Sequence, residues 1–224
     1  MSNKIKIPLI VVGSLAILYF ALSSVGIFRY YRMVTISGYP TLKQGDIFFV
    51  STLKKPKRFD LVCFYADIPD EGHVLVVHRL CGLPGDKVEL IDGTLFINGQ
   101  NADKNLDLSH LYTIPAKDEY KVLDYEPLED NFISHKSYDS LVVNFSDKTV
   151  LDNQLHYPKY TEAEIPNASI YEVYQKAWNA DNFGPIIIPN GHYFVLGDNR
   201  PNSMDSRYLG PIDQKNHYAT VLFK

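Results

Sequence analysis

The sequence predicts a mostly β protein built from antiparallel sheet. Short apolar runs of strand length recur through most of the chain, and turn-forming residues separate them. Two pairs, Asp92-Gly93 and Asn98-Gly99, stand between such runs, and an Asp-Gly pair is a strong hairpin signal. The predicted strands are residues 47–52, 60–65, 74–80, 87–91, 94–97, 185–188, 193–196 and 218–223.

The N-terminal segment predicts one transmembrane helix within residues 1–30. No charged residue occurs from Ile7 to Phe28, and about 20 apolar residues are needed to cross a bilayer. A cleavable signal peptide is the alternative, since Ala21-Leu22-Ser23 resembles a cleavage site. Its apolar region would however have to end after about 7–15 residues, and this one continues. Basic residues flank both ends, so charge alone does not fix the orientation.

The composition changes between residues 101 and 183. This stretch is rich in Asp, Glu, Lys, Asn and Tyr, and a helical pattern covers residues 170–178. His110, His135 and His156 lie here without metal-ligand spacing, and we expect them on the surface. The net charge of −4 over 224 residues gives no indication of a nucleic-acid partner, and no metal motif occurs.

A dense polar run follows the apolar strand 193–196. Residues 197–210 contain Asp, Arg, Ser and Asn side chains between two glycines. Such a composition favours a buried loop in which each polar group satisfies another. Loops of this kind often hold functional groups on a rigid scaffold.

Two further segments complete a pattern with this run. The chain resembles the type I signal peptidases, which are membrane-bound serine proteases that remove signal peptides. The matching segments are Ser37-Gly38-Tyr39-Pro40-Thr41-Leu42 with Gly45-Asp46, His78-Arg79 with Gly82-Leu83-Pro84-Gly85-Asp86, the polar run 197–210, and a weaker match at Asp60-Leu61-Val62-Cys63-Phe64. Together they cover residues 30–100 and 184–224.

The resemblance implies a domain organisation. A membrane anchor (1–30) would precede a catalytic β domain in two parts (31–100 and 184–224), and the variable stretch 101–183 would be an inserted cap subdomain. The enzyme would be a single-pass protein of the cell (inner) membrane, with its catalytic domain on the extracytoplasmic side and in contact with the lipid bilayer. Its partners would be signal-peptide-bearing precursor proteins. No metal or cofactor is implied, and the oligomeric state stays open.

The resemblance assigns Ser37 as the nucleophile and His78 to the position of the general base. Most bacterial relatives carry lysine there, whereas the endoplasmic-reticulum and archaeal enzymes carry histidine. Neutral imidazole, with an ordinary pKa near 6.5, is ready to act as a base at neutral pH without deep burial. Activity is therefore expected to rise with pH through about 6–7. His73 and Lys87 are alternative bases outside the family position.

The remaining site residues also follow from the resemblance. Thr35 and the Ser37 N–H would bind the oxyanion, and Ser203 would position the base. Asp205 either orients His78 or pairs with Arg207, and the sequence leaves both open. The substrate would contact Gly38, Tyr39 and Pro40, where Gly38 replaces the usual Met. Structural support would come from Arg79, Asp198 and Arg207.

Two other functions remain open. One is a dedicated maturation peptidase with few substrates, such as a pilus subunit. The other is a catalytically silent relative that binds signal peptides, which the changes at residues 38 and 78 make conceivable. The retained Ser37, Thr35, Ser203 and Asp205 argue against the silent relative. Cys63 and Cys81 both lie in apolar strand-like runs, and we expect them to be unpaired.

Overall fold

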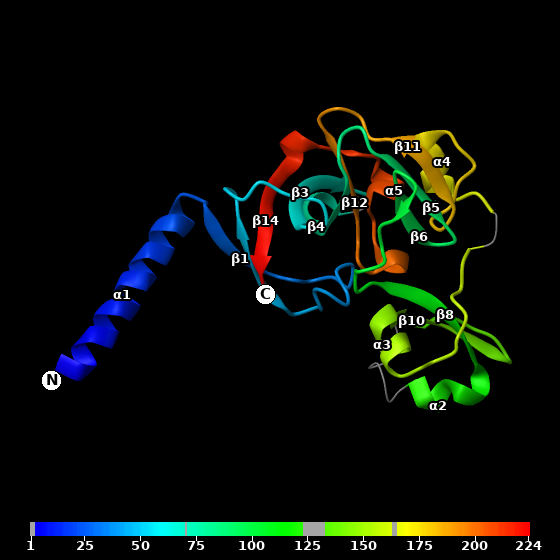
Figure 1. Cartoon of the computed structure of the whole chain (residues 1–224), viewed down its shortest axis with the longest axis horizontal. Helices are drawn as coiled ribbons and strands as arrows, with labels where there is room; N and C mark the ends of the chain where they lie inside the picture. The colour runs from blue at the N-terminus through cyan, green and yellow to red at the C-terminus, as the bar shows by residue number, and fades with distance from the viewer. Residues whose placement is uncertain (1–2, 70, 123–132, 163–164) are drawn as a thin grey trace.

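A computed structural model describes residues 3–69, 71–122, 133–162 and 165–224, without the side chains of residues 3–9, 22, 121–122 and 133–136. Figure 1 shows a β-rich body, a second lobe beside it, and the helix α1 (Asn3–Ser24) projecting away from the body. The predicted mostly antiparallel β fold is confirmed, since every pairing between named strands is antiparallel. Within the described part of the chain, no helix combines the length and the apolar character needed to cross a membrane.

The body is organised around a seven-stranded sheet. Its order is β1-β2-β14-β3-β4-β12-β13. Its longest strands, β3 and β4, form a hairpin that pairs without interruption from Leu61 opposite Arg79 to Ile68 opposite Gly72. The strands are β1 (Phe28–Arg32), β2 (Ile47–Ser51), β3 (Leu61–Ile68), β4 (Gly72–Gly82), β12 (His192–Leu196), β13 (Ile212–Asp213) and β14 (His217–Phe223).

A four-stranded sheet in the order β11-β5-β6-β7 packs against the first. Its turns are the two predicted from sequence: Asp92 and Gly93 have φ of 47° and 73°, and Asn98 and Gly99 have 53° and 78°. These left-handed conformations suit two-residue hairpin turns. The strands are β5 (Lys87–Ile91), β6 (Thr94–Ile97), β7 (Gln100–Asn101) and β11 (Phe183–Ile187).

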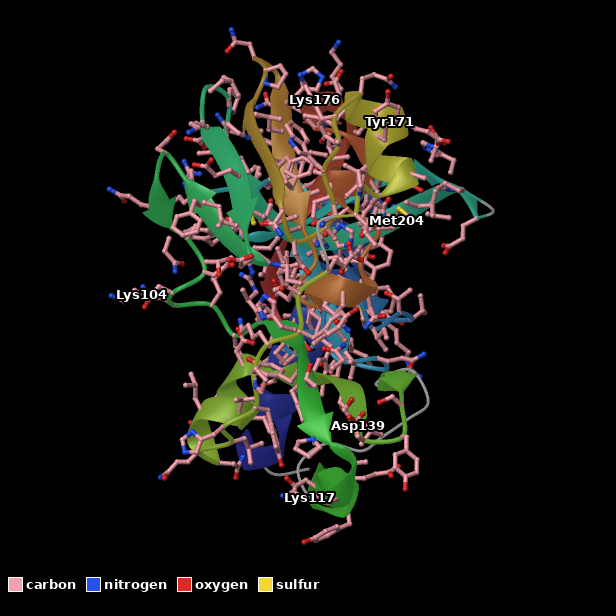
Figure 2. The ribbon with its side chains drawn as sticks, turned by 90° about the vertical axis from the view of Figure 1, so that its right-hand side faces the viewer. Lys104, Lys117, Asp139, Tyr171, Lys176 and Met204 are labelled. Carbon is pink, nitrogen blue, oxygen red and sulfur yellow. The ribbon has the colours of Figure 1, made fainter. Side chains whose placement is uncertain are left out.

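The second lobe is formed by part of the stretch 101–183. Its sheet has the order β8-β10-β9, and its core includes Tyr112, Ile114, Leu141, Val143 and Phe145. Lys117 and Asp139 mark its far end, opposite Tyr171 and Lys176 of the body (Figure 2). The lobe contains β8 (Ser109–Pro115), α2 (Glu119–Val122), β9 (Ile133–Lys136), β10 (Ser140–Ser146) and α3 (Asp147–Asp152).

The end of that stretch packs with the body instead. The expected helix is α4 (Ala168–Tyr174), and its Ile170 is fully buried with Phe183 among residues of β5, β6 and β12. The short α5 (Ser206–Leu209) contacts α4. Within the described residues of 101–183, only the lobe around β8–β10 has a core of its own, and this lobe is called the insertion below.

Candidate active site

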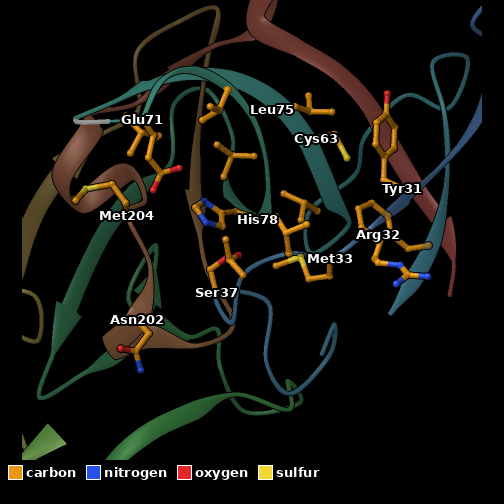
Figure 3. Close-up of a pocket in the computed structure, with 17 residues that line it drawn as sticks. Tyr31, Arg32, Met33, Ser37, Cys63, Glu71, Leu75, His78, Asn202 and Met204 are labelled. Carbon is orange, nitrogen blue, oxygen red and sulfur yellow. The ribbon is translucent and has the colours of Figure 1, made fainter. Parts of the chain in front are cut away.

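One cavity of about 520 Å³ opens between the start of the β domain and the β3–β4 hairpin. Its walls are mostly apolar, and both Ser37 and His78 line it (Figure 3). A largely apolar cleft with a few polar groups is typical of a ligand site. The lining residues are Tyr31, Arg32, Met33, Val34, Thr35, Ser37, Phe48, Cys63, Ile68, Glu71, Val74, Leu75, Val76, Val77, His78, Asn202 and Met204.

Ser37 lies in the loop between β1 and β2. It is half-buried, and its Oγ is 3.0 Å from Oγ1 of the exposed Thr35, within hydrogen-bonding distance. The structure therefore brings together the predicted nucleophile and the predicted oxyanion hydroxyl. Both Thr35 and Ser37 line the cavity.

His78 comes from β4 and is 2% exposed. Its ring lies 5.7 Å from that of Phe64, and its Nδ1 is buried without a hydrogen-bond partner among the described residues. Burial lowers its pKa to about 4, against the opposing charges of Asp205 and Asp198. The imidazole is thus neutral at pH 7. Its pKa lies well below the value of about 6–7 expected from the sequence, because the His78 ring is buried more deeply than the sequence indicated.

No hydrogen bond joins Ser37 to His78 among the bonds of the described residues, although both line the cavity. Catalytic hydrogen bonds are often long without substrate and tighten once it binds. A hydroxyl and a neutral imidazole in one apolar cavity can still support general-base activation of the serine.

Asp205 pairs with Arg207, one of its two predicted partners. Arg207 donates from Nε to Oδ1 (2.9 Å) and from Nη2 to Oδ2 (2.8 Å) of Asp205. The backbone N–H groups of Gly197 and Arg207 donate to the same carboxylate. Both carboxylate oxygens are thus occupied, and the pair is almost completely buried. The alternative of a hydrogen bond to His78 is not realised among the described contacts.

Ser203 contacts the nucleophile loop rather than the base. Its Oγ lies 2.6 Å from the carbonyl oxygen of Asn199 and 3.2 Å from that of Ser37. Gly197 makes this approach possible, because a Cβ at residue 197 would lie 1.8 Å from the Ser203 Oγ. The expected contact of Ser203 with the base is therefore replaced by a contact with the backbone of the nucleophile.

The predicted supporting residues form buried ion pairs. Arg79 donates from Nε (2.7 Å) and Nη2 to the carboxylate of Asp198, and from Nη1 to the Phe59 carbonyl. Arg200 makes a second two-point pair with Asp103. Two-point pairs of this kind fix orientation as well as charge. They hold the polar run 197–210 against β4 and the segment after β7.

The predicted substrate residues are not brought to the cavity. Gly38 and Tyr39 are buried, and neither they nor Pro40 is among the lining residues. A Cβ at Gly38 would lie 3.1 Å from Met33 Cε, so Met33 fills space that a side chain at residue 38 would take. The resemblance predicts substrate contacts at residues 38–40, after Ser37, whereas residues 31–35, before it, line the cavity.

The alternative bases lie elsewhere. His73 stacks on Tyr65 and contacts Asp67, and Lys87 pairs with Glu89, all outside the cavity. Both cysteines are free and buried, as predicted, and burial raises the pKa of each thiol to about 12. Among the described residues, no group of three or more His, Cys, Asp or Glu side chains is placed to hold a metal ion.

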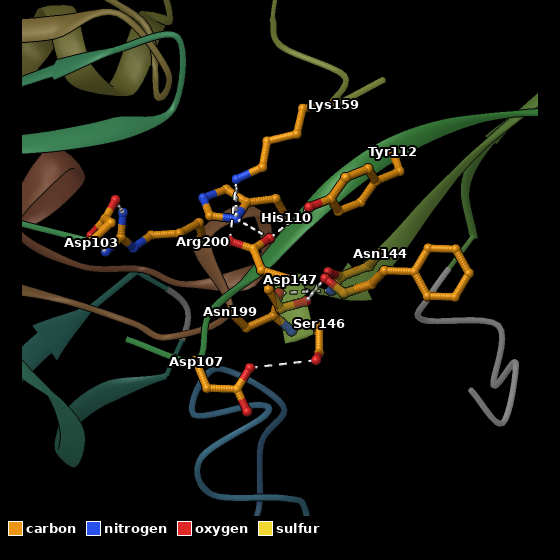
Figure 4. A network of polar contacts seen from close by, with 12 residues as sticks. Asp103, Asp107, His110, Tyr112, Asn144, Ser146, Asp147, Lys159, Asn199 and Arg200 are labelled. Atoms are coloured by element: carbon orange, nitrogen blue, oxygen red, sulfur yellow. Dashed lines mark hydrogen bonds and ion pairs between the residues drawn. The ribbon is translucent and has the colours of Figure 1, made fainter. Parts of the chain in front are cut away.

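Sequence reasoning missed the polar cluster in the insertion. His110, expected on the surface, is 6% exposed, and its Nδ1 lies 2.8 Å from Asp147 Oδ1. Tyr112 and Lys159 also bond Asp147 (Figure 4). Burial lowers the pKa of His110. His156 is exposed as expected, and the side chain of His135 lies outside the described residues. Spacing could not reveal the cluster, because His110 and Tyr112 lie on β8, Asp147 begins α3, and Lys159 lies in a later loop.

Comparison with known proteins identifies the family. The family model described as "Signal peptidase, peptidase S26" matches residues 6–224. Signal peptidase I of Rickettsia akari is 32% identical over 183 residues, covering 81% of this chain and 54% of that protein. Signal peptidase I of Buchnera aphidicola subsp. Baizongia pistaciae is 30% identical over 195 residues, covering 79% and 56%. The chain thus spans about half the length of the curated relatives it matches.

Among solved structures, a signal peptidase I from Enterococcus faecalis is 27% identical and covers 75% of this chain and 98% of its own, with a TM-score of 0.37. The family assignment rests on the sequence match, which runs through the Ser37 loop, the His78 strand and the polar run 197–210. This chain belongs to the signal peptidase family, peptidase S26.

Proposed function

We propose that this chain is a membrane-bound serine endopeptidase that cleaves N-terminal signal peptides from exported precursor proteins. One observation carries the proposal: Ser37, bonded to the Thr35 hydroxyl, shares an apolar cavity with the neutral imidazole of His78. Family membership supports the same reaction, since the curated relatives carry the name signal peptidase I.

In the proposed mechanism, His78 removes the proton from Ser37 Oγ as that oxygen attacks the scissile carbonyl. The resulting oxyanion accepts hydrogen bonds from the Ser37 N–H and the Thr35 hydroxyl. The C–N bond then breaks, and the protonated imidazole gives its proton to the leaving amine. Water hydrolyses the acyl-enzyme with His78 again as the base, which restores the Ser37 hydroxyl.

The substrate is proposed to bind as an extended strand. β1 lies at the edge of the large sheet, and residues 31–35, which end and follow it, line the cavity. An edge strand offers free backbone groups for strand addition. The apolar walls suit the small side chains that the family implies at the first and third positions before the cut.

We also propose that residues 7–28 attach the enzyme to the cell membrane, with the β domain on the extracytoplasmic side. The absence of charge in that segment supports this. Ser37 follows closely in the chain, so the site would work near the bilayer surface. Extraction of membranes with alkaline carbonate tests the attachment, and release of the chain into the soluble fraction would refute it.

Cleavage of a model precursor with an Ala-x-Ala site, in detergent, tests the function. We expect the wild type and the matched control His73→Ala to cleave it, and Ser37→Ala and His78→Ala to be inactive. Activity that survives His78→Ala would transfer the base role to another residue. A folded wild type that cleaves no export precursor would refute the proposal and favour a dedicated or silent relative.

A further inference from the structure

A chain of buried amide groups connects the insertion to the nucleophile loop. We propose that Asn144, in the insertion, is a positioning residue for catalysis. It acts through Asn199 on the peptide group between Ile36 and Ser37, whose N–H is the oxyanion donor. The inference rests on the proposed function and gives the insertion a role in it. The contacts that carry it run from Ser109 through Asn144 and Asn199 to Ile36, and Figure 4 labels Asn144 and Asn199.

The insertion holds Asn144 firmly. Asn144 lies on β10 and is 1% exposed, and its Oδ1 is in hydrogen-bond contact with the fully buried Ser109 hydroxyl of β8. Ser109 itself docks on the body, because its backbone N–H donates to the Asp198 carbonyl (2.9 Å). The Nδ2 of Asn144 is thereby directed at Asn199, to whose Oδ1 it donates at 2.7 Å.

Asn199 in turn hydrogen-bonds to the loop that contains Ser37. It is fully buried, its Nδ2 donates to the Ile36 carbonyl (3.1 Å), and its backbone N–H donates to the Ser37 carbonyl (3.1 Å). The only other side-chain donor to its Oδ1 among the described bonds is Asn202, at 3.3 Å. The hydrogen bond from Asn144 thus sets the orientation of the Asn199 amide: its Oδ1 faces Asn144, and its Nδ2 faces the Ile36 carbonyl.

The Ile36 carbonyl and the Ser37 N–H belong to the same peptide group. A peptide group is planar, so its C=O and N–H point in opposite directions as one rigid unit. The Ile36 carbonyl accepts from the Asn199 amide (3.1 Å) and from the Tyr39 N–H (3.0 Å), so Asn199 is one of two donors that fix the direction in which the Ser37 N–H points. The bond from Asn199 also polarises the peptide and strengthens the N–H as a donor. Asn144 consequently acts on the transition state without touching the substrate.

The kinetic test is Asn144→Ala in the precursor cleavage assay. Removal of a whole oxyanion donor costs about 10²–10³ in kcat, so misdirection of one donor is expected to lower kcat about tenfold. KM should change less than about twofold, because the effect is confined to the transition state. Val142→Ala, at a buried position two residues away on β10, is the matched control and should keep kcat.

The coupling test repeats Asn144→Ala in an Asn199→Ala background. If Asn144 acts through Asn199, its effect on kcat disappears there, and the double variant is no slower than Asn199→Ala alone. Two independent tenfold losses would overturn the relay. Asn144→Leu serves as a second variant of similar size if Asn144→Ala does not fold.

A third measurement does not depend on cleavage. Deuterium exchange of the peptide covering residues 33–42 should be faster in Asn144→Ala than in Val142→Ala, while exchange of β5 and β6 stays equal. Unchanged exchange at residues 33–42 together with unchanged kcat would refute the inference. If the wild type cleaves no precursor, the proposed function fails on its own, and the exchange result still decides whether Asn144 holds the loop.

Discussion

The loop of Ser37 and the loop 197–210 differ in how deeply their polar side chains are buried. In the first, Thr35 is exposed and Ser37 is half-buried, and their hydroxyls contact each other beside the cavity. In the second, charged and amide side chains are almost completely buried and satisfy one another, namely Asp198, Asn199, Arg200, Asp205 and Arg207. The predicted nucleophile and the predicted oxyanion hydroxyl thus lie in the more exposed loop, whereas the buried ion pairs lie in the other.

This difference separates activity from stability. A buried ion pair is costly to break, because removing one partner leaves an uncompensated charge away from water. A half-buried hydroxyl is cheap to remove. Changes in the Ser37 loop should therefore affect the reaction alone, whereas changes in the loop 197–210 should affect folding first. The predictions below test that separation.

The largest effect is expected for Ser37→Ala. Without the nucleophile, precursor cleavage should fall by about 10⁴–10⁶-fold, the scale on which serine proteases lose activity when a triad member is removed. The midpoint of chemical unfolding should match that of the wild type, because only one half-buried hydroxyl is lost. A marked loss of stability would show that Ser37 is part of the scaffold, and the separation would fail.

Asp205→Asn tests the other loop. The new amide keeps the shape of the side chain but cannot balance the buried Arg207, so we expect a loss of about 3–5 kcal/mol in the free energy of unfolding. Urea unfolding measures it. The control is Asp67→Asn in the exposed pair with His73, which should change stability by less than about 1 kcal/mol. A stable but slow Asp205→Asn enzyme would instead assign Asp205 to His78.

Acid should weaken the fold through His78. Its pKa is about 4 in the folded protein and near 6.5 when unfolded, so between these values only the unfolded chain binds the proton. Stability is thus intact above about pH 6.5 and is lost as the pH falls toward 4, by about 2 kcal/mol between pH 7 and 5. His78→Leu should lose correspondingly less over that interval, as measured by urea unfolding at both pH values.

The lowered pKa of His78 should also change the pH dependence of precursor cleavage. The acid limb of the kcat/KM profile should lie nearer pH 4 than pH 6.5, because the imidazole stays neutral until then. A limb at pH 6.5 or above would mean that His78 is hydrated in the working enzyme or that another group is the base.

Gly197→Ala tests the close contact between the two loops. The added methyl group would overlap Ser203, whose Oγ and Cβ lie 1.8 Å and 2.4 Å from its position, and would approach the Ser37 carbonyl. Overpacking of this kind costs about 1–3 kcal/mol. Adding Ser203→Gly should restore part of the stability. If the double variant is no more stable than Gly197→Ala, the strain does not come from Ser203.

Much of the fold followed from short-range pattern. The strands β5 and β6 were predicted with their observed bounds, because a tight turn and the alternation around it are local. The strands β8 and β10 were missed, although they form the core of the insertion. Their stretch is rich in polar residues, and their buried face is defined only by pairing with each other.

For the site, the sequence alone predicted Ser37, Thr35 and His78, which line one cavity, together with the polar character of the loop 197–210. Chemical identity is local, and the motifs carry it. Only the tertiary structure decided that Asp205 pairs with Arg207, that Ser203 bonds the Ser37 backbone, and that Met33 fills the space beside Gly38. These contacts join segments that are far apart in the sequence and that packing brings together. One polar group can bond several kinds of partner, so the three-dimensional geometry, and not the residue type, determines which partner it bonds.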